Sequence, residues 1–274
     1  MTPQLHIHIL ASGSKGNAAV VEGPAGSVLV DCGISRRELL RRGGALGVDV
    51  EAVDAVIVTH EHSDHVSGLP AFCNNYGGPV FSTAGTASAR KSIAGTPFEL
   101  VGHDDVLELA GMTLRLFPTS HDVADPFGIR FEVSGADGEP ADAVGWCTDT
   151  GVLTAEALGL LRDARILGIE SNHDSDMLKN GPYPYFLRQR VGGERGHLSN
   201  DQCADALPLL VGEDTETVVA LHLSQKNNRP SVCMRTLAAA MGATVDAGRP
   251  NEARTPDGLL SLCCASQTEP LTIW

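Results

Sequence analysis

The side chains most able to bind metal are concentrated in one short run, THEHSDH, at residues 59–65. It follows the apolar run 55–58, whose β-branched residues are typical of a buried strand. His60 and His62 alternate as the chain leaves that strand, so both can point the same way. Imidazole nitrogens and carboxylate oxygens suit zinc, manganese or iron. Asp64 and His65 bring the potential ligands to four within six residues. Four are too many for one tetrahedral metal that also holds a water, so we expect two metals.

The motif resembles the signature of the metallo-β-lactamase superfamily, and three later strand ends extend the resemblance. The family fold is α/β, an αββα sandwich of two mixed β-sheets flanked by helices, with a dinuclear metal site on one edge. The resemblance implies seven ligands: His60, His62 and His121 on one metal, Asp64, His65 and His222 on the other, and Asp149 bridging the two. Asp31, at the end of a predicted strand, would support the ligand loop without binding metal.

Two residues outside the ligand set resemble those of the RNase Z-like phosphodiesterases that process tRNA 3′ ends. They are Glu170, which follows a predicted strand, and His197, in the segment GHLSNDQCA. The resemblance implies that Glu170 orients His197, and that His197 stabilises the phosphorane and protonates the leaving oxygen. Asp64 would orient a hydroxide held by both metals, which attacks the phosphorus.

The joint pattern of motifs narrows the resemblance further. SGSKGN, THEHSDH, TDTG, ESNHD, GHLSN and HLSxxNN follow one another between Leu10 and Asn228. In this order they resemble the YycJ (WalJ) family of bacterial metal-dependent exonucleases. The resemblance implies phosphodiester hydrolysis, 5′→3′ on duplex DNA, with two divalent cations: zinc or manganese, with iron also allowed. Alternatives are a small-molecule hydrolase of the same fold (a cyclic phosphodiesterase, or a glyoxalase II or lactonase-type ester hydrolase) and a non-catalytic metal-bound module.

Polar residues near these motifs are candidates for binding the substrate. They are Lys15, His173, Lys226, Asn227 and Asn228. Lys15 lies in the Gly/Ser loop 11–17, which either cradles a phosphate through backbone N–H groups or is an ordinary turn. For the lysines and asparagines the alternative is a polar surface that binds nothing, and for His173 it is a structural part in holding the loop after Glu170.

The elements that must position these side chains follow from periodicity and capping signals. Strands are predicted at 5–10, 28–33, 55–58, 79–82, 106–109, 112–117, 127–133, 143–147, 165–169, 218–221 and 259–263. Helices are predicted at 35–46, 66–76, 83–93, 154–162, 183–190 and 232–241, with another opening at Ser199 or Asn200. Ser35 and Glu38 have the spacing of a capping box. We expect His6 and His8 on the polar face of the first strand.

Length and composition limit the organisation of the chain. Its 274 residues fit a single domain over 1–274. The interval from His121 to Asp149 is too short for the tRNA-binding exosite arm of RNase Z. The interval from Asp149 to Glu170 is too short for a β-CASP insertion. The net charge of −14 argues against a general nucleic-acid coat protein but allows a local basic groove.

Cysteine usage and hydropathy indicate the compartment. The seven cysteines are odd in number and include no CxxC pair, so we expect reduced, mostly buried thiols. No apolar stretch approaches the roughly 20 residues of a membrane span, and the start of the chain lacks the pattern of a signal peptide. We therefore expect a cytoplasmic protein with no membrane partner. The superfamily resemblance also allows a homodimer.

Overall fold

The computed structural model describes residues 4–135, 138 and 140–274. Residues 1–3, 136, 137 and 139 therefore lie outside it, within the Gly/Asp/Pro-rich segment 134–142 in the case of the last three. The chain divides into two compact units. The first comprises Met1–Pro118, Val123–Ala143 and Ser266–Trp274, and the second Thr119–Asp122 and Val144–Ala265. The C-terminal tail thus returns to the unit in which the chain begins. The single-domain organisation stays a prediction.

The first unit contains a mixed seven-stranded sheet with the order β16-β1-β2-β3-β4-β5-β6. Its pairs are antiparallel from β16 to β3 and parallel from β3 to β6. The strands are β1 His6–Ala11, β2 Ala18–Gly23, β3 Gly26–Val30, β4 Ala55–Ile57, β5 Val80–Ser82, β6 Phe98–Leu100 and β16 Leu271–Ile273. The same unit holds an antiparallel meander of β7 Val106–Leu109, β8 Met112–Pro118 and β9 Phe127–Ser134.

Short helices cover one face of this sheet. They are α1 Arg36–Leu46, α2 Ser63–Val66, α3 Leu69–Cys73 and α4 Ala84–Ala89, with a 3-10 turn at Val50–Ala52. Leu39 of α1 and Phe72 of α3 share one buried cluster with Leu29 and Val56 of the central strands. The cluster explains why helices of modest length persist, because packing of an apolar face contributes more than intrinsic propensity.

Two local predictions in this unit are wrong. The helix predicted at 66–76 is divided into α2 and α3, because the backbone N–H of Gly68 donates to the carbonyl of Cys32 at 2.8 Å. His8 is 2% exposed rather than on a polar face, and its ring lies 2.9 Å from the hydroxyl of Thr272. The strand that covers it, β16, is distant in sequence and was not predicted.

The second unit contains another mixed sheet. Its strands β10, β11, β12 and β15 are parallel neighbours, and β14 and β13 extend the order in antiparallel fashion. The strands are β10 Pro140–Cys147, which begins in the first unit, β11 Ile166–Glu170, β12 Thr217–Leu221, β13 Thr244–Val245, β14 Glu252–Arg254 and β15 Ser261–Cys264. All five residues of β11 are buried, as is typical of a parallel strand covered on both faces.

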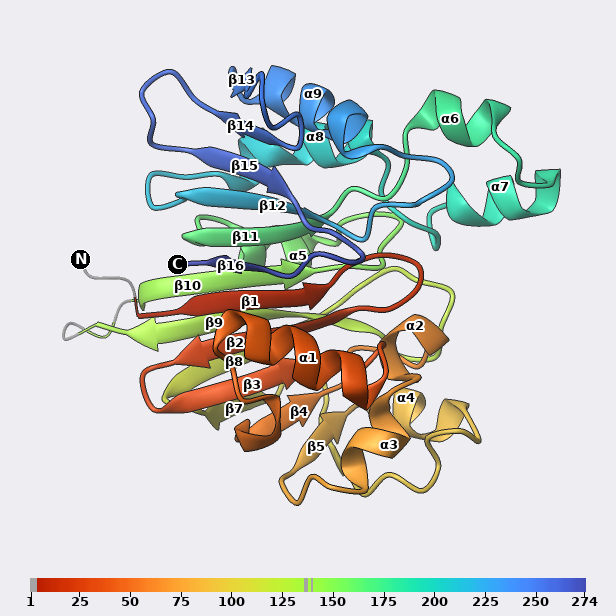
Figure 1. Cartoon of the computed structure of the whole chain (residues 1–274), viewed down its shortest axis with the longest axis vertical. Coiled ribbons are helices and arrows are strands. Elements are labelled where there is room, and N and C mark those ends of the chain that lie inside the picture. The colour runs from red at the N-terminus through yellow and green to blue at the C-terminus, as the bar shows by residue number, and fades with distance from the viewer. Residues whose placement is uncertain (1–3, 136–137, 139) are drawn as a thin grey trace. The chain divides into compact units, whose positions relative to one another are not determined.

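The helices of the second unit fall into two groups. Those of the body are α5 Ala155–Leu161, α8 Asn200–Leu210 and α9 Pro230–Ala240, and those of a projecting pair are α6 Ser175–Asn180 and α7 Tyr185–Val191. Figure 1 shows α8 and α9 beside β12, β14 and β15, and α6 and α7 extending away from that sheet. Ser199 caps α8 through a complete capping box with Gln202. Among the described residues, no helix combines the length and apolarity needed to cross a bilayer.

Candidate metal centre

The predicted site residues lie just after the carboxyl ends of parallel strands in each unit. Asp31 directly follows β3, Asp149 is the second residue after β10, and His222 directly follows β12. All three have a positive φ angle, of 60° at Asp31, 56° at Asp149 and 55° at His222. They are three of the five non-glycine residues with positive φ among the residues that the structure describes. Such conformations are costly and persist where the surroundings enforce them, often at functional sites. The backbone is thus bent at two proposed ligands, Asp149 and His222, and at Asp31, which supports the ligand loop.

In the first unit, Asp31 organises the ligand loop. Its Oδ2 atom accepts a hydrogen bond from Nδ1 of His65 at 2.7 Å. Its Oδ1 atom accepts from the backbone N–H of Thr59 at 2.8 Å. Asp31 is 1% exposed and His65 is fully buried. Because the Nδ1 proton of His65 is held by the carboxylate, the lone pair of that ring is on Nε2, the arrangement seen when carboxylates orient metal-binding histidines.

The other predicted ligands of this unit lie next to His65. The ring centroid of His60 is 3.9 Å from that of His65 and 5.1 Å from that of His62. An Oδ2 atom of Asp64 lies 3.9 Å from Nε2 of His65. The structure therefore brings the four potential ligands of the THEHSDH run together, as predicted from their spacing.

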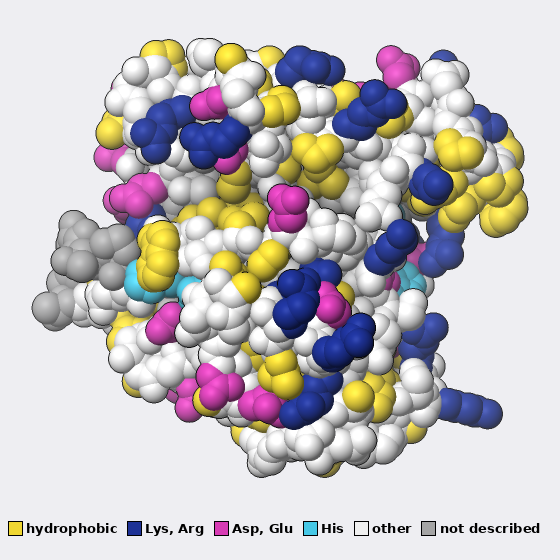
Figure 2. Space-filling view, viewed as in Figure 1, with side chains coloured by type: hydrophobic (Ala, Val, Ile, Leu, Met, Phe, Trp, Pro, Cys, Tyr) yellow, Lys and Arg dark blue, Asp and Glu magenta, His cyan; other side chains and the backbone are white. Residues whose placement is uncertain are grey.

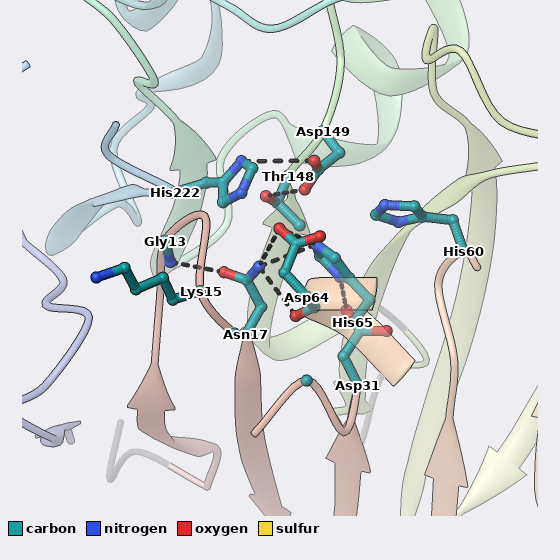
Figure 3. Close-up of polar contacts among 12 residues, drawn as sticks. Gly13, Lys15, Asn17, Asp31, His60, Asp64, His65, Thr148, Asp149 and His222 are labelled. Atoms are coloured by element: carbon teal, nitrogen blue, oxygen red, sulfur yellow. Dashed lines mark hydrogen bonds and ion pairs between the residues drawn. The ribbon is translucent and has the colours of Figure 1, made fainter. Parts of the chain in front are cut away.

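Asn17 belongs to the same cluster and was not predicted as a site residue. Its Nδ2 atom lies 2.9 Å from Nε2 of His65, and its backbone N–H donates to the carbonyl of Asp64 at 2.7 Å. The N–H of Gly13 donates to Oδ1 of Asn17 at 2.8 Å and fixes the orientation of the amide. Figure 3 shows these contacts, with the side chain of Lys15 extending away from them. The SGSKGN loop therefore supports the ligand loop.

In the second unit, Glu170 is the centre of a buried hydrogen-bond network. Its Oε1 atom lies 2.9 Å from Nδ1 of both His197 and His222. Its Oε2 atom accepts from the backbone N–H groups of Thr150 at 2.8 Å and Leu198 at 3.2 Å. Burial raises the pKa of Glu170, but the charge of His197 and the hydrogen bonds from both imidazoles outweigh it and lower the pKa to about 2. The carboxylate is therefore ionised, and both histidines carry a proton on Nδ1.

Asp149 lies beside this network. Its Oδ1 atom is 3.4 Å from Nδ1 of His222 and 3.6 Å from Nε2 of His121. The hydroxyl of Thr148 donates to its Oδ2 atom at 2.7 Å (Figure 3). The Nδ1 of His121 donates to the carbonyl of Gly196 at 2.9 Å. Burial lowers the pKa of His121 despite the nearby carboxylate of Asp149, which favours the neutral imidazole that metals bind.

The donor set of the second unit fits a divalent metal. Asp149, Glu170, His197 and His222 each offer one ligand atom, and these atoms all lie within 4.8 Å of one another. Nitrogen and carboxylate oxygen donors of this kind suit zinc or manganese. Since Glu170 holds the Nδ1 proton of His222, Nε2 of that ring is left as its donor atom.

The predicted substrate contacts fall into two groups. Lys15 and Lys226 are exposed. His173, Asn227 and Asn228 are buried, at 3%, 0% and 5% exposure. The amide of Asn228 donates to the backbone carbonyl of the residue after Glu170 at 2.9 Å, so it holds the loop together. The side-chain atoms of Asn227 and Nδ1 of His173 are buried without a hydrogen-bond partner among the described residues.

The sequence itself matches a known family over most of the ligand-bearing region. Residues 27–223 match the model of the beta-lactamase superfamily domain. The chain belongs to the beta-lactamase superfamily. This membership and the cluster of His and Asp ligands make it a metal-dependent hydrolase, as predicted.

Relatives of this superfamily chain include two curated exodeoxyribonucleases. Exodeoxyribonuclease YycJ of Bacillus anthracis is 29% identical over 241 residues, which cover 86% of this chain and 89% of the relative. Exodeoxyribonuclease WalJ of Streptococcus pneumoniae is 29% identical over 249 residues, covering 87% and 90%. The resemblance to the YycJ (WalJ) family is therefore confirmed.

Among solved structures, the metallo-beta-lactamase fold protein YhfI from Bacillus subtilis superposes with a TM-score of 0.68 at 14% identity. The superposed region covers 98% of this chain and 100% of the YhfI chain. At this identity the likeness concerns the fold, and it confirms the predicted metallo-β-lactamase architecture of mixed sheets and helices.

Proposed function

We propose that this superfamily member hydrolyses phosphodiester bonds of DNA as an exonuclease. The observation that carries the proposal is the pairing of His197 with the buried carboxylate of Glu170 at 2.9 Å. A hydrolase of neutral esters has less need for an additional imidazole outside the ligand set that is paired with a carboxylate. The names of the two curated relatives support the same substrate class.

We further propose that the ligands are those implied by the family resemblance: His60, His62, Asp64, His65, His121, Asp149 and His222. The contacts of Asp31 with His65 and of Glu170 with His222 support this, because each holds the Nδ1 proton of a proposed ligand. Two divalent cations, when bound, would supply positive charge for the phosphate and lower the pKa of a coordinated water. Zinc, manganese and iron all suit these donors.

The protein's own residues have distinct parts in this proposal. Glu170 fixes the ring of His197 through Nδ1, so Nε2 points away from the carboxylate and can deliver the proton that the leaving oxygen needs. Asp64, 20% exposed at its side chain and next to His65, can accept a hydrogen bond from the attacking water. His173, Asn227, Lys15 and Lys226 remain proposed substrate contacts. For Asn228 the internal hydrogen bonds support a structural part instead.

A small cyclic phosphodiester is the second candidate substrate. The net charge of −14 favours a compact substrate over a polyanion, since repulsion of DNA must be offset locally. Ester hydrolysis of the glyoxalase II or lactonase type gains no support from the Glu170–His197 pair. The cytoplasmic location and the homodimer stay predictions.

The proposal is tested by digestion of duplex DNA labelled at either the 5′ or the 3′ end, with manganese or zinc added. We expect mononucleotides to appear first from the 5′-labelled end. His60→Ala should abolish this release, whereas His103→Ala, which replaces a histidine of the first unit outside the ligand set, should retain it. If DNA stays intact with either metal while a small cyclic phosphodiester is cleaved, the second candidate replaces the first. Simultaneous loss from both ends would contradict the 5′→3′ polarity.

A further inference from the structure

The helices α6 and α7 form an excursion of the second unit, residues 174–196, that the proposed chemistry does not use. Asp174 caps α6 at one end, and the backbone N–H of His197 donates to the carbonyl of Val191 at 2.8 Å at the other. The guanidinium of Arg188 donates to the carbonyl of Lys179 and ties α7 to α6. The excursion thus leaves the body directly after His173 and returns directly before His197.

The exposed side of the excursion carries two adjacent aromatic residues. Tyr185 and Phe186 are 70% and 72% exposed, and α7 contains no buried residue at all. Figure 2 shows hydrophobic side chains gathered where Figure 1 draws α6 and α7. Contiguous exposed apolar surface of this kind usually marks a binding site. Most of the surface of both rings is exposed, so they contribute little to the packing of the second unit and are accessible to a ligand.

Charge identifies the kind of partner that fits this surface. The chain has a net charge of −14, whereas the excursion at residues 174–196 carries four basic and three acidic residues. Lys179 is exposed, and the side chain of Arg190 is 55% exposed while it pairs with Asp122. Exposed aromatic rings interspersed with Lys and Arg are the features by which proteins bind single-stranded nucleic acid, through stacking on bases and attraction of phosphates.

We propose that α7 binds unpaired nucleotides at the end of a nucleic-acid substrate, with Tyr185 and Phe186 stacking on bases and the basic residues contacting phosphates. This rests on the proposed function and specifies how the substrate is held. The six steps between the seven residues of α7, Tyr185–Val191, span about 9 Å of helix at 1.5 Å per residue. That length corresponds to about three stacked nucleotides at 3.4 Å each. A strand held on α7 would therefore reach the end of the helix that contacts His197.

The test compares binding of two labelled duplexes, one blunt and one with a four-nucleotide overhang, by fluorescence anisotropy with EDTA present to prevent cleavage. Tyr185→Ala/Phe186→Ala should weaken binding of the overhang duplex at least tenfold, since removal of one stacking ring weakens binding by about 5- to 150-fold. Leu209→Ala, which removes a 62% exposed apolar side chain of α8 in the same unit, should bind both duplexes like the wild type. Lys179→Gln should reduce the slope of log K against the logarithm of the salt concentration by about one, where K is the binding constant.

The outcomes separate this inference from the proposed function. If the wild type digests DNA but the double variant binds the overhang duplex as tightly, the inference about α7 is wrong and the nuclease proposal stands. If the wild type neither binds nor digests DNA, the proposed function fails first. If light scattering shows that the double substitution converts a dimer to a monomer, the rings are covered by a second copy of the chain and the inference is overturned. An unchanged melting temperature shows that any loss of binding is not due to unfolding.

Discussion

Oε1 of Glu170 lies 2.9 Å from Nδ1 of His197, and the carboxylate is fully buried. A buried charge of this kind is retained only when it is well paired, and here two imidazoles and two backbone N–H groups surround it. The arrangement fixes the tautomer of His197 and directs Nε2 away from the carboxylate. A histidine held in this way is suited to proton transfer at Nε2.

The role of His197 can be separated from metal binding by the leaving group. His197→Ala should lower turnover of DNA by about 10²- to 10⁴-fold, because the leaving oxygen then lacks its proton donor. With bis(p-nitrophenyl) phosphate the loss should be much smaller, because nitrophenolate leaves without a proton. Kinetics on both substrates and elemental analysis of the variant check this. An equal loss on both substrates, or loss of bound metal, would show that His197 is a ligand instead.

The hydrogen bond from His65 to Asp31 should control metal affinity. Asp31→Asn keeps the shape of the side chain and tolerates the positive φ of 60°. It removes the charge that orients the imidazole, so the affinity for zinc should fall by about 10- to 100-fold. Titration against a competing chelator measures the change. The matched control is Asp54→Asn, which alters a carboxylate that accepts from the N–H of Ser27 in the same unit. Equal metal affinities in the two variants would show that Asp31 does not control metal binding.

Close backbone packing behind the ligand loop gives a prediction about stability. A Cβ atom at Gly33 would lie 1.7 Å from the carbonyl oxygen of Asp64, so Gly33→Ala must displace the loop that carries Asp64 and His65. We expect a loss of at least about 2 kcal/mol in the free energy of unfolding. Gly44→Ala is the control, because nothing lies within 4 Å of its Cβ position in α1. It should stabilise the protein by about 0.5–1 kcal/mol. Urea unfolding measures both, and equal effects would contradict the packing described.

His173 should make the protein sensitive to acid. Burial lowers its pKa from 6.5 to about 4. Between these pH values the unfolded chain binds a proton that the folded chain does not, so the free energy of unfolding falls as the pH decreases. The contribution lost between pH 6.5 and pH 4 is about 3 kcal/mol. His173→Gln lacks the titrating group, so its stability should fall less over this range, as urea unfolding at several pH values can show. If the free energy of unfolding depends on pH in the same way in wild type and variant, the pKa of His173 is not lowered by burial and its imidazole contacts water.

Local sequence signals predicted the elements that present the ligands. Runs of β-branched residues located the strands before His60 and His222, and a cap at Ser199 or Asn200 located the start of α8. The spacing within THEHSDH predicted the cluster of His60 and His65, since it depends on one strand and the turn that follows it.

Features set by distant contacts were not predicted. Asn17 reaches Nε2 of His65 across 48 residues, and no local pattern distinguishes it from an ordinary turn residue. The strand β16 pairs with β1 from the opposite end of the chain and buries His8. The capping box predicted for α1 forms only in part: Ser35 accepts from the N–H of Glu38, while the carboxylate of Glu38 pairs with Arg41. Charge pairing within the helix therefore took the side chain that the local rule assigned to the cap.

The most direct test of the central claim compares substrates on one metal-loaded preparation. The values of kcat/KM would be measured for an end-labelled DNA duplex, a small cyclic phosphodiester, a thioester and a lactone, each with His60→Ala as the blank. The account predicts that phosphodiesters are hydrolysed, DNA with the highest kcat/KM, and that the thioester and lactone are not hydrolysed above the blank. Hydrolysis of the thioester or lactone with both phosphodiesters intact would contradict it.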